Sequence, residues 1–108
     1  TGRLLLSRDG YPVNLIAVFE ACAKHKVFIE INAHPVRLDL DWRHMRTAKD
    51  MGVEFVINPD AHNTNEIAYT RYGVGVARKG WLTKDDALNT KSLAAVRRIL
   101  DARRARRP

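Results

Sequence analysis

A chain of 108 residues with 45% hydrophobic residues suits one compact domain, or part of a larger one, and is too apolar to be disordered throughout. We expect no membrane span and no secretory leader, because no apolar run is long enough. The single cysteine, Cys22, cannot form an internal disulfide, so we expect it to pack in the core of a cytoplasmic protein.

The net charge of +7 is concentrated at the end of the chain. A basic helical tail at 97–108 holds six arginines against Asp101 and accounts for +5 of this charge. Such a tail favours salt-dependent contact with a polyanion such as DNA, a solvated helix end, or a stretch that another domain would cover. High positive charge alone therefore identifies no partner.

Helix-like and strand-like segments alternate along the chain. Apolar spacing and capping residues predict helices at 13–26, from Asp39 or Asp41 to Gly52, at 65–78, and at 92–106. Continuous β-branched and aromatic runs predict buried strands at 27–31 and 53–57. Gly73 and Gly75 weaken the prediction of the third helix, and 81–90 is expected to be a short connection. The last helix is expected to turn its apolar side inward, with Leu93, Val96, Ile99 and Leu100 on that side.

A strand, a helix and a second strand in succession predict a parallel pair and place the chain in the α/β class. Two strands alone would leave both edges of the sheet open. We therefore expect either a fragment of a larger sheet or a chain that completes its sheet with a partner. A fragment would expose apolar surface and tend to self-associate.

Polar residues follow each predicted strand, where α/β folds commonly place their sites. Asp60 and His62 lie after the second strand and would share one side of an extended backbone. A carboxylate and an imidazole suit Zn²⁺ or Mn²⁺, whereas the alternative is a surface loop with a capping aspartate and a solvated histidine. Glu30 and Asn32 close the first strand and are candidates to orient such a ligand or its loop.

Taken together, four segments resemble the end of a PHP (polymerase and histidinol phosphatase) domain, in the form fused to family X DNA polymerases of bacteria and archaea. They are EINAHPVRLDL at 30–40, NPDAH at 58–62, RYGVGVARKGW at 71–81 and LNT at 88–90. The resemblance covers nearly the whole chain, residues 1–108, and its order and spacing are more specific than any single motif.

The resemblance implies the C-terminal portion of a distorted seven-stranded α/β barrel that binds two or three Mn²⁺ or Zn²⁺ ions. It implies a metal-dependent phosphoesterase, acting as a 3′-5′ exonuclease in DNA repair, with a polymerase domain earlier in the parent chain. Asp60 and His62 match the last metal-binding motif of the family, and Glu30 and Asn32 match a supporting loop. The other ligands would lie upstream, one of them just before Thr1, so the fragment alone is expected to be inactive.

Arg37 and Arg71 are candidate contacts to the phosphates of DNA, whereas His34 is assigned no role. Two alternatives to the exonuclease remain open at this point. One is a phosphatase for small phosphorylated metabolites, and the other is a binding module without catalysis.

Overall fold

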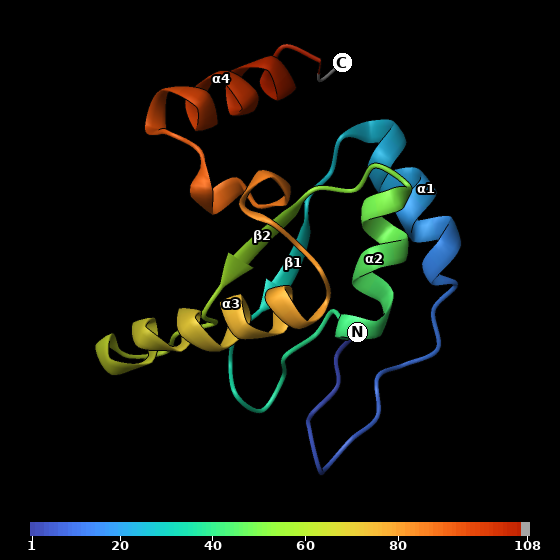
Figure 1. The fold of residues 1–108 in the computed structure, drawn as a ribbon, viewed down its shortest axis with the longest axis vertical. Helices are drawn as coiled ribbons and strands as arrows, with labels where there is room; N and C mark the ends of the chain where they lie inside the picture. The colour runs from blue at the N-terminus through green and yellow to red at the C-terminus, as the bar shows by residue number, and fades with distance from the viewer. Residues whose placement is uncertain (107–108) are drawn as a thin grey trace.

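Two parallel strands form a small sheet at the centre of the computed structural model, which describes residues 1–106 (Figure 1). β1 (Ile29–Asn32) pairs with β2 (Phe55–Asn58), and Ile31 lies opposite Ile57. The parallel direction and the α/β character expected from the sequence are confirmed within this part of the chain. Whether the sheet belongs to a barrel stays a prediction.

Helix α1 (Leu15–His25) is shorter than the predicted 13–26 because its ends are fixed by specific caps. The side chain of Asn14 accepts a hydrogen bond from the amide of Ala17 at 3.1 Å. Lys26 adopts the left-handed conformation, with φ of 56°, and so ends the helix. Phe19 is the buried residue of α1, and Cys22 is half-buried against the core.

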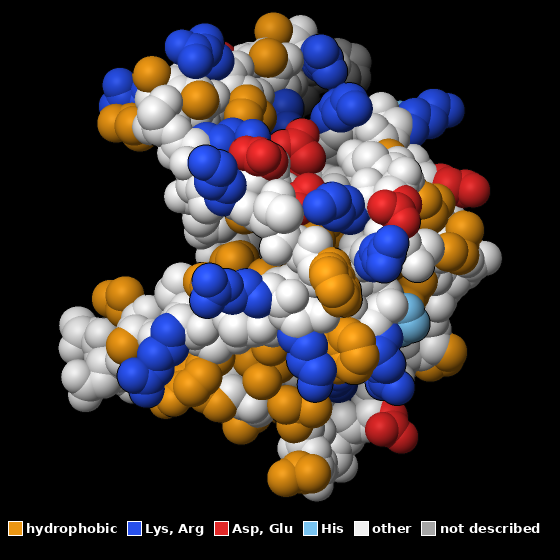
Figure 2. Space-filling view, viewed as in Figure 1, with side chains coloured by type: hydrophobic (Ala, Val, Ile, Leu, Met, Phe, Trp, Pro, Cys, Tyr) orange, Lys and Arg blue, Asp and Glu red, His pale blue; other side chains and the backbone are white. Residues whose placement is uncertain are grey.

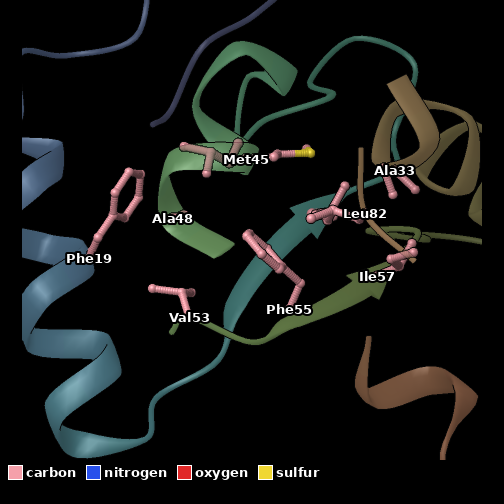
Figure 3. Close-up of a cluster of buried hydrophobic side chains, with 11 residues drawn as sticks. Phe19, Ala33, Met45, Ala48, Val53, Phe55, Ile57 and Leu82 are labelled. Atoms are coloured by element: carbon pink, nitrogen blue, oxygen red, sulfur yellow. The ribbon is translucent and has the colours of Figure 1, made fainter. Parts of the chain in front are cut away.

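Helix α2 (Trp42–Asp50) begins at Asp41, which was one of the two predicted starts. The Asp41 carboxylate accepts a hydrogen bond from the amide of Arg43 at 2.9 Å, as an N-cap residue does. The core lies between α1, α2 and the sheet (Figure 3). Its largest fully buried side chains are Phe19, Ile31, Met45 and Phe55.

The third helical region divides into the 3₁₀-helix η1 (Thr64–Tyr69) and helix α3 (Thr70–Lys79). Gly73 lowers the helix propensity of α3 but lets the helix lie directly on the sheet. A Cβ atom at Gly73 would be 2.5 Å from Cγ2 of Ile57 and 2.7 Å from Cβ of Ala33. The first residues of α3 therefore lie close to the carboxyl ends of the strands (Figure 1).

The prediction that both edges of the sheet are open is wrong for β2. The segment expected to be a simple connection forms the short helices η2 (Lys84–Asp86) and η3 (Leu88–Thr90). Ala87 makes a parallel bridge to Phe55, and the side-chain amide of Asn89 bonds both backbone groups of Ile57, at 2.7 and 2.8 Å. This segment therefore substitutes for a neighbouring strand.

Helix α4 (Leu93–Arg104) lies apart from the sheet (Figure 1), and the prediction of a buried apolar side is wrong. Leu93 is 66% exposed and Leu100 is 44% exposed, because α4 lies beyond η3 and has little to pack against. Its side chains mix exposed apolar groups with arginine (Figure 2). The predicted basic tail extends to 108, and positions 107–108 lie outside the described residues.

Among the helices of residues 1–106, none combines the length and the apolar character that a membrane crossing requires.

Candidate functional site

The carboxyl ends of both strands meet at one edge of the sheet, where the predicted site residues lie. The Nδ2 group of Asn32 donates a hydrogen bond to Oδ2 of Asp60 at 3.1 Å, so residues 28 positions apart in the sequence are in direct contact. Glu30 contacts a different residue, because its Oε1 accepts a hydrogen bond from Nδ2 of Asn58 at 2.8 Å. Asn32 therefore positions the Asp60 carboxylate, whereas Glu30 links the two strands.

The amide of Asn32 is fixed at both of its ends. Its Oδ1 accepts a hydrogen bond from the backbone amide of His34 at 3.0 Å, while its Nδ2 binds Asp60. Because the oxygen is already bonded to a donor, the orientation of the side-chain amide is set. The carboxylate of Asp60 thus meets a donor that is already oriented by the loop after β1.

Asp60 does not lie in extended backbone, so the expected reason for its proximity to His62 is wrong. Its φ is 54°, in the left-handed region, where aspartate and asparagine are tolerated better than most residues. The chain turns at Asp60 immediately after β2, and the ring of His62 bends back toward the turn. The two residues are brought together by this turn and not by the alternation of a strand.

The ring of His62 is held in one protonation pattern by the backbone. Its Nδ1 lies 2.7 Å from the carbonyl oxygen of Asp60. A carbonyl oxygen can only accept, so Nδ1 carries the proton in this contact, and in the neutral ring Nε2 keeps its lone pair. Metal-binding histidines commonly donate their other ring N–H in this way. The side chain is 74% exposed, which leaves Nε2 accessible.

Glu66 completes the loop and was missed in the sequence. Its Oε2 accepts a hydrogen bond from the backbone amide of His62 at 2.7 Å, and its Oε1 accepts one from Nδ2 of Asn63 at 2.9 Å. Oε2 also lies 3.8 Å from Nδ1 of His62. The spacing Asn63-x-x-Glu66 resembles a capping box at the start of η1, and this signal could have identified Glu66.

The two arginines proposed to contact phosphates occupy different settings. Arg37 is half-buried, and its Nη1 donates to the carbonyl oxygen of Arg3 at 3.2 Å. Arg71 is exposed at the start of α3, where its guanidinium lies over the ring of Tyr72. The structure does not bring Arg37 and Arg71 into contact with each other or with Asp60 and His62.

The segment at the start of the chain packs beside the loop after β1. Arg3 donates hydrogen bonds to the carbonyl oxygens of Arg37 and Leu38 and forms an ion pair with Asp41, with Nη1 to Oδ2 at 2.7 Å. The pKa of Asp41 is lowered, chiefly by its hydrogen bond from Arg43, and Arg3 contributes to the same effect. A cavity of about 660 Å³ lies along this segment, but Asp60 and His62 do not line it.

The donor atoms of the site fit part of a metal centre. The Asp60 carboxylate and Nε2 of His62 are the oxygen and nitrogen donors that Zn²⁺ and Mn²⁺ accept. Within residues 1–106, however, no group of three or more His, Cys, Asp or Glu side chains is placed to hold an ion. A structural zinc site requires four ligands, and a catalytic one requires three. Asp60 and His62 alone are therefore too few to hold such an ion.

The chain is similar in sequence to one segment of a known DNA polymerase. No family model matches the chain. Over 100 residues, which make up 93% of this chain, the sequence is 41% identical to the DNA polymerase/3′-5′ exonuclease PolX of Bacillus subtilis (strain 168). The chain spans only 18% of the length of that relative. Its sequence is thus related, over nearly all of its residues, to one segment of a family X polymerase.

Proposed function

We propose that the chain is the C-terminal part of a metal-dependent phosphoesterase domain of the PHP type, in a longer family X DNA polymerase that shortens 3′ ends of DNA during repair. The observation that carries this proposal is the loop after β2, where Asp60 is held by Asn32 and His62 has a free Nε2. The name of the similar protein joins a DNA polymerase with a 3′-5′ exonuclease. The same combination is proposed for the longer protein that carries this chain.

Exposed apolar surface supports the proposal of a larger barrel. At the outer edge of β1, the amide of Asn32 donates to the carbonyl oxygen of Asp39 at 2.6 Å, so the loop after β1 covers the end of this edge. Exposed apolar side chains on α1, including Ile16 and Val18, would be covered by the rest of such a domain.

In this proposal Asp60 and His62 would hold a Mn²⁺ or Zn²⁺ ion, and the remaining ligands would come from other segments of the longer protein. The chemistry that such an ion supplies is stabilisation of the charge on the attacked phosphate. Asn32 orients the Asp60 carboxylate, and the carbonyl oxygen of Asp60 orients the His62 ring. Glu66 fixes the backbone at His62, so the two ligand atoms are set before an ion binds.

The test uses the longer protein and measures Mn²⁺-dependent shortening of a single-stranded oligonucleotide from its 3′ end. Asp60→Asn keeps a residue that tolerates the left-handed backbone, so its folding should be unchanged while activity falls. His62→Ala removes the free Nε2. Each variant should lose at least about a hundredfold in rate, because charge stabilisation by an ion amounts to several kcal/mol. His25→Ala, at the exposed end of α1, is the matched control and should retain full activity.

The outcomes separate the proposed exonuclease from its alternatives. Activity of both site variants equal to that of wild type would show that Asp60 and His62 are not the site. Hydrolysis of a small phosphomonoester in preference to DNA would favour a metabolite phosphatase. A wild-type protein that neither retains Mn²⁺ or Zn²⁺ nor shortens DNA would favour a binding module.

A further inference from the structure

A cluster of aromatic rings is linked to the candidate metal ligand Asp60 through the loop after β1. The rings of Tyr69 and Tyr72 have centroids 5.8 Å apart, and the ring of His34 meets Tyr69 edge-on at 5.1 Å. His34 follows Asn32 by two residues and donates its amide proton to the side chain that holds Asp60. A continuous series of contacts therefore connects Asp60 to the aromatic cluster.

Arg71 covers the exposed end of this cluster as a flat cation. Its guanidinium carbon is 4.8 Å from the centre of the Tyr72 ring, and its Nη2 donates to the Tyr72 hydroxyl at 2.9 Å. The hydrogen bond and the ring together restrain the guanidinium. Arg71 is exposed and Tyr72 is 38% exposed, so the outer face of the guanidinium is open to solvent.

We infer that Arg71, supported by Tyr72, is a stacking platform for an unpaired base at the 3′ end of a DNA strand. Bases stack on aromatic rings and on the planes of arginine guanidinium groups, and the fit depends little on which base is present. A base would stack on the exposed face of the Arg71 guanidinium, while the ring and the hydroxyl of Tyr72 restrain that guanidinium. This inference rests on the proposed function and adds to it the means by which the strand end is held.

The stacking role differs in chemistry from a phosphate contact by the same arginine. A phosphate needs only a positive charge, which lysine also carries, whereas a stacked base needs the flat guanidinium. Arg71→Lys therefore separates the two roles. Tyr72→Leu keeps apolar bulk but removes the ring beneath Arg71, while Tyr72→Phe keeps the ring and loses only the hydrogen bond.

The experiment measures binding of a short, fluorescent single-stranded DNA oligonucleotide to the longer protein by anisotropy. Excess EDTA prevents hydrolysis and makes the result independent of the metal ligands. Arg71→Lys and Tyr72→Leu should each weaken binding by about 5- to 150-fold, the range of one lost base stack. Tyr72→Phe keeps the ring and loses only the hydrogen bond, so it should weaken binding less than Tyr72→Leu does. Trp81→Leu is the matched control, because Trp81 is an exposed aromatic residue just beyond the other end of α3, a helix about 15 Å long.

An oligonucleotide without bases at its 3′ end keeps the phosphates and removes the stacked partner. Wild type and Arg71→Lys should bind this abasic strand equally. Two results would contradict the stacking platform. In one, Arg71→Lys binds the normal strand as tightly as wild type does. In the other, Arg71→Lys loses the same affinity for the normal and the abasic strand. Failure of the proposed exonuclease has a different signature, because it is the absence of Mn²⁺-dependent shortening by wild type.

Discussion

Replacement by alanine should stabilise the protein at Gly75 of α3 but not at Gly73. Both lie inside the helix, where replacing glycine by alanine favours folding by about 1 kcal/mol. Nothing lies within 4 Å of a Cβ atom at Gly75, so Gly75→Ala should raise the free energy of unfolding by about that amount. A Cβ atom at Gly73 would be 2.5 Å from Ile57 and 2.7 Å from Ala33, far inside the about 3.5 Å at which carbon atoms make favourable contact.

The helix must therefore move off the sheet in Gly73→Ala, and overpacking of this kind costs about 1–3 kcal/mol. The gain in helix propensity offsets about 1 kcal/mol of this cost. The free energy of unfolding of Gly73→Ala should therefore lie between that of wild type and a value about 2 kcal/mol lower. The difference between the two variants should be about 1–3 kcal/mol in urea unfolding followed by circular dichroism. The added substitution Ala33→Gly removes one of the two close contacts and should restore part of the loss. Equal stability of Gly73→Ala and Gly75→Ala would refute the reasoning that α3 lies directly on the sheet.

Two further predictions concern the edge of β2 and the acid sensitivity of α2. Asn89→Ala should lower the free energy of unfolding by about 1–3 kcal/mol, because it leaves the amide and carbonyl of Ile57 without their partner. Urea unfolding measures this loss. A loss below about 0.5 kcal/mol would mean that water replaces the side chain. The folded-state pKa of Asp41 is lowered, first by its hydrogen bond from Arg43, so its contribution to stability is present above the unfolded pKa of about 3.9 and is lost as the pH falls below it. Urea unfolding between about pH 5 and pH 3 should therefore show a steeper loss of stability in wild type than in Asp41→Asn, and identical slopes would contradict the assignment.

At the candidate site, the sequence predicts which loops meet but not the conformation of the backbone within them. Asp60 follows a buried strand, and parallel strands end at one edge, so contact with the loop after β1 could be foreseen. The left-handed turn at Asp60 could not, because aspartate occupies many conformations and only the observed backbone reveals the positive φ. For the same reason the contact between the Asp60 carbonyl and Nδ1 of His62 was not anticipated.

The sequence by itself determined the order of helices and strands, because apolar spacing and caps such as Asp41 act over a few residues. Tertiary structure decided features that depend on residues distant in sequence. Gly73 is compatible with a helix because α3 presses on the sheet, and the edge of β2 is covered because Asn89 bonds to Ile57. Leu93 and Leu100 of α4 stay exposed, and Val96 and Ile99 are only half-buried, for a related reason. A helical pattern specifies which side chains share a face, but only the surrounding structure provides a surface against which that face can be buried.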